Sequence, residues 1–263
     1  MKVKDEADKV LTNAANADAL ALGAKFTVGM VLTGHGVPPA LVLALTALID
    51  GVRPVWMQRP TELTVGIVER LQELEINVEE LTKNNEHFAS VLALALREAI
   101  VTHEKQKIDA LRNAVVNTAA GIDIEEQTQL VMLGVLSQLS ELHIRALIFL
   151  NNPMAYPEPP RPPDEELTYK VGFERAFSHA IPELDYRTSG LYQAVITDLY
   201  IKGLSTVNPL MDDGGWQATT LTMDFNRRQV RPLTTWLGGR LIDYIGETVG
   251  DRVDENSSNE DEN

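Results

Sequence analysis

The sequence of 263 residues has no cysteine, and aromatic residues make up only 6% of the chain. Without cysteine the chain forms no disulfide and offers no thiolate as a nucleophile or metal ligand. Zinc and iron–sulfur sites built on cysteine are therefore excluded. Hydrophobic residues still account for 44% of the chain, an ordinary value for globular proteins, so we expect a buried core.

Basic residues are scarce relative to acidic ones: 23 Lys and Arg face 38 Asp and Glu, a net charge of −15. Such a balance argues against a protein whose whole surface binds nucleic acid. A third of the net charge belongs to residues 251–263, which contain six acids, one arginine and a single valine. This segment is predicted to be a disordered acidic tail, because it has almost no apolar surface to offset the entropy of ordering it.

Residues 26–49 form an apolar stretch without Asp, Glu, Lys or Arg. A bilayer-spanning helix needs about 20 apolar residues, so the length alone allows a membrane span. Gly34, Gly36, Pro38 and Pro39 interrupt the stretch, and the two shorter pieces favour a buried helical hairpin. Insertion into a membrane remains the alternative. The N-terminus lacks the pattern of a secretory signal, and we expect a cytoplasmic protein.

The chain up to residue 150 shows helical periodicity and no credible strand, and we assign residues 1–135 to a helical domain. Residues 60–75 are predicted to form an amphipathic helix. Residues 86–117 are predicted to form one long helix, because no glycine or proline interrupts them. Two helices that meet at the polar residues 102–107 are the alternative.

Two shorter helices are predicted from their capping residues. Asp123 and Glu126 have the spacing of a capping box, and Ser140 is a suitable N-cap for the next helix. Residues 151–163 contain six of the thirteen prolines and are predicted to form a stiff polyproline II connector. An SH3-type docking motif that includes Arg161 is the alternative for this stretch.

Residues 136–250 are predicted to form a second, α+β domain. A helix is expected from Asp164 to Ser178, and another after Thr188 and Ser189 that ends at Gly203. Strand signals then appear for the first time. The expected elements are a strand at 216–225, a turn at 226–228, a return strand at 229–233, and a final helix that starts at Thr234 or Thr235.

This order of three helices, a small β-hairpin and a last helix resembles a winged-helix domain of the MarR type. The landmarks are Gly203-Leu204 at a helix end, Leu233-Thr234 after the hairpin, and Gly238 in the last helix. The resemblance implies a mainly α protein with a helical N-terminal part followed by a winged-helix-like module. A further passage resembles the Abi-alpha-like bacterial proteins linked to abortive phage infection, through Leu139, Ser140, His143, Leu147 and Leu150.

In DNA-binding members of the winged-helix class, the third helix enters the major groove and the wing contacts phosphate. The module has few basic groups, so we favour binding to a protein partner or to another copy of the chain over binding to DNA. A DNA-binding regulator and a membrane-active phage-defence effector are the alternatives. The candidate contact residues for DNA or a partner are Arg187, Gln193, Thr197, Lys202, Arg227, Arg228 and Arg231.

The sequence contains no recognisable catalytic motif. Its five histidines lack the spacing of helical metal sites, and it has no nucleophile elbow, P-loop or kinase signature. Acidic pairs such as Glu79-Glu80 fall near predicted helix N-termini, where the helix dipole accounts for them. We therefore expect a non-enzymatic protein without metal or cofactor.

Overall fold

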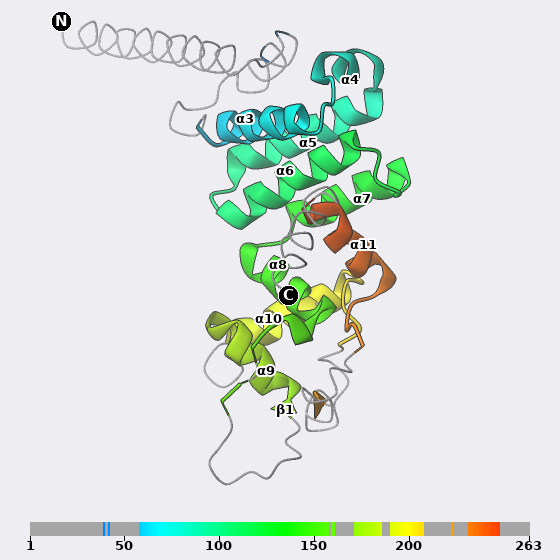
Figure 1. The fold of residues 1–263 in the computed structure, drawn as a ribbon. Coiled ribbons are helices and arrows are strands. Elements are labelled where there is room, and N and C mark those ends of the chain that lie inside the picture. Colours follow the sequence, from blue (N-terminus) through cyan, green and yellow to red (C-terminus); the bar gives the residue numbers. More distant parts are fainter. Residues whose placement is uncertain are drawn as a thin grey trace, which may run out of the picture. The chain divides into compact units, whose positions relative to one another are not determined.

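The computed structural model describes residues 39, 42, 58–157, 159–160, 171–185, 190–207, 222–223 and 231–247 (Figure 1). In these residues the protein is mainly α-helical, which confirms the predicted fold class at that level. They form two compact units, one of the residues up to Leu133 together with Glu247, the other of those from Gly134 to Gly246. The boundary predicted from the sequence lies after residue 135. That each part folds independently stays a prediction.

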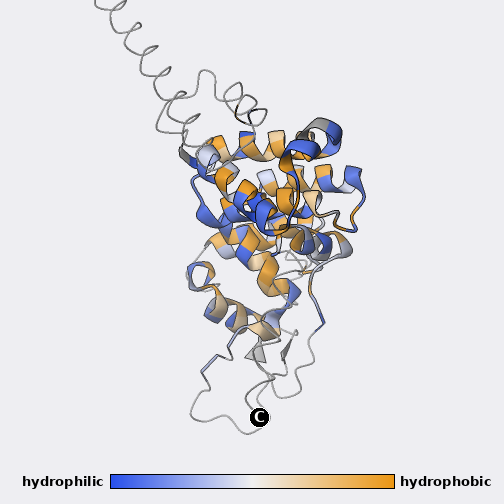
Figure 2. Ribbon diagram, turned by 45° about the horizontal axis from the view of Figure 1, so that its top comes forward, coloured by the Kyte–Doolittle hydropathy of each residue, from blue (hydrophilic) through white to orange (hydrophobic). Residues whose placement is uncertain are grey.

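The N-terminal unit is built on three helices, α3, α5 and α6, that pack against one another (Figure 1). Hydrophobic and hydrophilic residues are divided around these helices, as Figure 2 shows. The buried side chains include Leu63, Ile67, Phe88, Leu92 and Leu111. The helices are α3 Gln58–Glu73, α4 Val78–Asn84, α5 Glu86–Val101, α6 Lys105–Ala119 and α7 Glu126–Ser137, which crosses into the next unit.

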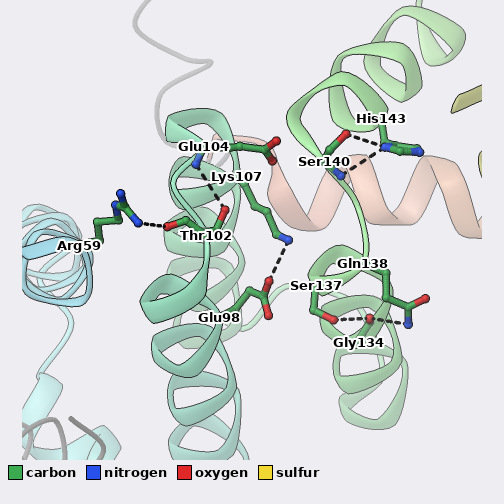
Figure 3. Close-up of polar contacts among 10 residues, drawn as sticks. All are labelled: Arg59, Glu98, Thr102, Glu104, Lys107, Gly134, Ser137, Gln138, Ser140 and His143. Carbon is green, nitrogen blue, oxygen red and sulfur yellow. Dashed lines mark hydrogen bonds and ion pairs between the residues drawn. The ribbon is translucent and has the colours of Figure 1, made fainter. Parts of the chain in front are cut away.

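The single helix predicted for residues 86–117 is wrong, because the chain breaks between α5 and α6. Thr102 caps α5 in an extended conformation, with φ −84° and ψ 149°. Its carbonyl accepts a hydrogen bond from Arg59 Nη1 at 2.8 Å, and Lys107 pairs with Glu98 at 2.9 Å across the break (Figure 3). The break lets the apolar faces of α5 and α6 pack on each other. The bond from Arg59 satisfies the Thr102 carbonyl, which the end of α5 leaves without a helical partner.

The predicted capping box at the start of α7 is also wrong, because the helix begins three residues after Asp123. The first helical hydrogen bond runs from the Gln129 N–H to the Glu125 carbonyl, at 3.0 Å. The buried Gln129 side chain donates to the Ile124 carbonyl and accepts from the Thr118 hydroxyl, each at 2.7 Å. These two bonds hold the connection from α6 to α7, and Asp123 lies outside the helix.

The C-terminal unit is arranged around α8, which packs against α9, α10 and α11. The ring of Phe149 on α8 is fully buried at the centre of an aromatic cluster. The elements are α8 Glu141–Asn151, the 3₁₀ turn η2 Pro153–Ala155, β1 Val171–Gly172, α9 Phe173–Ala180, the 3₁₀ turn η3 Pro182–Leu184, α10 Gly190–Ile201, β2 Thr222–Met223 and α11 Trp236–Ile245.

The start of the predicted polyproline II connector is helical instead. Asn151 ends α8, and Pro153–Ala155 form a 3₁₀ turn. Proline suits the first position of such a turn because its missing N–H would have no partner there. Pro153 is buried, and the Tyr156 ring packs against that of Phe149 at a tilt of 59°, with ring centroids 5.2 Å apart. Residues 158 and 161–163 of the connector lie outside the described residues.

Most of the predicted β-hairpin, residues 216–221 and 224–230, lies outside the described residues, so the hairpin stays a prediction; its described residues pair with other segments. β1 and β2 pair antiparallel, with Val171 opposite Met223, so residues 171–172 are not part of the helix predicted from Asp164. The described end of the predicted return strand does not join β2. Its Leu233 N–H donates to the Leu150 carbonyl at 2.8 Å, and its carbonyl accepts from the Thr206 N–H at 2.9 Å. The predicted turn at 226–228 and the helix start at 164–170 lie outside the described residues.

Two further predictions fall largely on residues that are not described. Of the apolar stretch 26–49, only Pro39 and Val42 are described, and both are helical. The acidic tail at 251–263 lies wholly outside the described part. Among the helices that are described, none combines the length and the apolar character needed to span a membrane.

Candidate functional site

Helix α10, the predicted third helix of the module, has a well-defined end. Gly203 has φ +70°, a conformation that favours glycine, and its N–H donates to the Tyr200 carbonyl at 2.9 Å. The Leu204 N–H donates to the Leu199 carbonyl at 2.9 Å, which completes a Schellman motif. The structure therefore confirms the predicted glycine cap and fixes the register in which α10 presents its side chains.

Helix α10 exposes apolar side chains together with the polar Gln193 and, in part, Thr197 and Asp198. Tyr192, Val195, Ile196 and Leu199 are buried against the rest of the unit. On the other side, the side chain of Ile201 is 68% exposed. Leu191 and Ala194 are also exposed, and their spacing from Ile201 places them on the same side of the helix. We call Leu191, Ala194 and Ile201 the α10 face.

An exposed tryptophan lies beside the C-terminal end of the α10 face. Thr235 is the N-cap of α11, as the sequence predicted within one residue, and its hydroxyl donates to the Gly203 carbonyl at 2.5 Å. This bond holds the first turn of α11 against the end of α10. Trp236 follows Thr235 directly and is 70% exposed. The unit therefore exposes a large aromatic side chain next to the residue that binds the end of α10.

Lys202, a predicted contact residue, is held inside the unit by two side chains. Its ammonium group lies 3.1 Å from Asp198 Oδ1 and 3.2 Å from Gln138 Oε1, and the side chain is only 20% exposed. The other oxygen of Asp198 lies 3.3 Å from His143 Nε2. Lys202 therefore links the end of α10 to the turn before α8 and is poorly placed to bind a phosphate group.

The structure places the other predicted contact residues as follows. Gln193 is exposed and Thr197 is half-buried, four residues apart on one side of α10. Arg231 is exposed ahead of α11. Arg187, Arg227 and Arg228 lie outside the described residues.

The basic side chains in the described part of the C-terminal unit are mostly bound by oxygen atoms of the same unit. Arg145 binds both carboxylate oxygens of Glu183, at 2.9 and 3.1 Å. Arg175 donates to the Pro160 carbonyl at 2.6 Å, and Arg240 lies 3.8 Å from Asp243. With Lys202 held by Asp198, this part of the unit offers little positive charge to a nucleic acid backbone.

The Arg145–Glu183 pair predicts that the stability of the fold falls slightly in acid. The hydrogen bond from Arg145 lowers the pKa of Glu183, and a carboxyl group with a lowered pKa stabilises the fold above its ordinary pKa. That stability is lost as the pH falls through the lowered value. The Glu183 side chain is 54% exposed, so Glu183→Gln should cost about 0.5 kcal/mol or less at pH 7 and less than that at pH 3.

Urea denaturation of the wild type and Glu183→Gln at pH 7 and pH 3 measures this difference. Arg145→Gln and the double variant complete a cycle that isolates the pair from other effects of each substitution. An equal stability difference between wild type and Glu183→Gln at both pH values would contradict the assignment.

The described residues show no metal centre. A pocket in the N-terminal unit is lined by both acidic and basic side chains and so does not select a ligand of one charge. No group of three or more His, Asp or Glu side chains among them is placed to hold a metal ion. The N-terminal unit has an open pocket of about 420 Å³ that includes Gly66. Its two arginines are paired on their own helices, Arg70 with Glu73 at 2.6 Å and Arg112 with Asp109 at 3.2 Å. The other lining residues are Glu69, Asn113 and Glu247.

The interaction surface was only partly predictable. Gln193 and Thr197 were placed on α10 by periodicity, whereas the exposed positions of Leu191, Ile201 and Trp236 were missed. An apolar residue on an apolar helix carries no signal of exposure. No protein-family model matches the chain, and no curated protein or solved structure shows significant similarity to it.

Proposed function

We propose that the C-terminal unit is a winged-helix-like module that binds a protein, either a partner or a second copy of this chain. The binding surface is the α10 face together with Trp236. The observation that carries the proposal is the exposure of Ile201 and Trp236, at the ends of α10 and α11 that the bond from Thr235 to Gly203 ties together. Large exposed aromatic and aliphatic side chains of this kind form the centres of protein–protein interfaces.

The order of elements supports the winged-helix part of the proposal. Helices α8, α9 and α10 precede β2 and α11, as in the domain that the sequence resembles. The pairing of β1 with β2 also links the start of α9 to the segment after α10. The binding of Lys202 by Asp198 and Gln138 favours a protein over DNA as the partner, because α10 then has no lysine or arginine directed at a phosphate.

The double variant Ile201→Gln, Trp236→Gln is expected to weaken association at least tenfold, because two exposed apolar anchors are removed. Sedimentation velocity of the purified chain measures self-association. Chemical crosslinking in cells followed by mass spectrometry identifies a different partner. Leu94→Gln, which changes a residue 42% exposed in the N-terminal unit, is the matched control and should leave association unchanged.

The same protein is titrated with duplex DNA at low salt to separate the alternatives. If the proposal is right, the chain does not bind duplex DNA in the way that weakens steeply as the salt concentration rises. A chain that stays monomeric, crosslinks to no protein and binds duplex DNA would overturn the proposal. Loss of that DNA binding in Arg231→Ala would then assign the module to DNA.

A further inference from the structure

Helix α8 starts with an unusual capping box in which histidine takes the place of glutamate or glutamine. Ser140 is the N-cap in an extended conformation, with φ −88° and ψ 169°. Its N–H donates to Nδ1 of His143 at 3.3 Å, and its hydroxyl oxygen lies 2.7 Å from the same nitrogen (Figure 3). A capping box needs an acceptor at this position, and a histidine provides one only where the nitrogen is unprotonated.

In the form of the capping box proposed here the His143 ring is neutral and Nδ1 is an acceptor. Nδ1 accepts from the Ser140 N–H, so the proton of a neutral ring is on Nε2. Nε2 faces Asp198 Oδ2 at 3.3 Å, where an N–H can donate to the carboxylate. A second proton must enter at Nδ1. That proton can be donated to the Ser140 hydroxyl oxygen, 2.7 Å away, but it removes the acceptor of the Ser140 N–H, whereas the contact to Asp198 is kept.

We propose that His143 is a proton-sensitive cap of α8: the neutral ring closes the capping box, and the protonated ring opens it. Histidine is the side chain that ordinarily changes charge between pH 5 and 8, and this is the range in which the cap is tested. Protonation also places a positive charge in the first turn of α8, where the helix dipole opposes it. The proposal concerns the helix cap and does not depend on the proposed binding of a protein partner.

The described elements that pack on α8 carry the following charged groups, of which Asp198 contacts the His143 ring. From α10, Asp198 contacts the ring and Lys202 shares the same carboxylate. On α8 itself, Arg145 is held by Glu183 of η3. The remaining charged groups are Glu141 on α8, Arg240 and Asp243 on α11, and Glu174, Arg175 and His179 on α9; η2 contributes none.

Opening of the capping box should loosen the first turn of α8 without detaching the turn that joins α7 to α8. This turn is also held from α10, because the Lys202 ammonium group bonds to Gln138 Oε1 at 3.2 Å. Asp198 binds Lys202 with one oxygen and His143 with the other, so the two contacts meet at one carboxylate. Loss of the Ser140 bond therefore leaves the turn attached to α10 but loosens the first turn of α8.

The test is amide hydrogen exchange of the full chain between pH 7.5 and pH 5.5, corrected for the intrinsic exchange rate. Protection of the Ser140 amide is expected to fall about fivefold as the His143 ring gains its proton, a loss typical of a helix cap. The ring is followed in the same samples by NMR of its nitrogens. The midpoints of the two changes should coincide.

Two variants separate the cap from general effects of pH. His143→Gln retains an acceptor for the Ser140 N–H but does not titrate, so its protection should be independent of pH over this range. His179→Gln removes the other described histidine of the unit and should respond like the wild type. The proposal is overturned if Ser140 protection stays constant while the His143 ring titrates, if the ring does not titrate between pH 5 and 8, or if His143→Gln shows the same fall.

Discussion

Gly238→Ala should destabilise the C-terminal unit by about 3 kcal/mol or more, because the first turn of α11 leaves no room for a methyl group. A Cβ atom at Gly238 would overlap the carbonyl oxygen of Leu204 and lie 3.0 Å from its carbonyl carbon. That oxygen cannot move away freely, since it accepts the Thr235 N–H at 3.0 Å. The Gly238 N–H is itself part of the cap, as it donates to Thr235 Oγ1 at 3.1 Å.

Gly239→Ala is the matched control, one residue further along the same helix. Its Cβ would meet no atom closer than Asn151 Oδ1 at 3.9 Å, which is an ordinary contact. Alanine is the better helix former by about 1 kcal/mol, so this variant should be neutral or slightly stabilising. Urea denaturation of both variants measures the difference. Equal stabilities of the two variants would show that α11 does not approach Leu204 as closely as described.

Features fixed by a few neighbouring residues were predictable from the sequence. The N-cap at Ser140, the positive φ of Gly203 and the start of α11 near Thr235 were all expected, and each depends on contacts within one helix turn. Gly238 was noted only as a landmark of a resemblance. Its physical role depends on Leu204, which is 34 residues away and therefore invisible to local pattern reasoning.

Features that depend on distant contacts were missed. The break after Thr102 contains neither glycine nor proline, and its carbonyl is satisfied by Arg59 from another helix. Val171 fits a helical pattern, yet it pairs with Met223 some fifty residues later. The exposure of Ile201 likewise depends on which side of an apolar helix the rest of the unit covers. Periodicity reports the spacing of apolar residues and contains no information on their partners.

Phe149→Ala should cost about 3–5 kcal/mol of stability, because it removes the centre of the aromatic core of the C-terminal unit. The Phe149 ring is fully buried, and its centroid lies 5.2 Å from those of Tyr156 and Phe177 and 6.0 Å from that of Phe173. These rings come from α8, the segment after η2, and α9. Their edge-to-face and tilted contacts add to the hydrophobic stabilisation of each ring. Alanine would leave a cavity that three surrounding rings cannot fill without moving.

Trp236→Ala is the control for the loss of an aromatic side chain. Trp236 is 70% exposed, so its removal should change stability by no more than about 0.5 kcal/mol. Phe149→Leu keeps part of the volume and should fall between the wild type and Phe149→Ala. Thermal and urea unfolding followed by circular dichroism rank the variants. If Trp236→Ala lowers stability as much as Phe149→Ala, the core of the unit does not centre on Phe149, because an exposed ring would then contribute as much as a buried one.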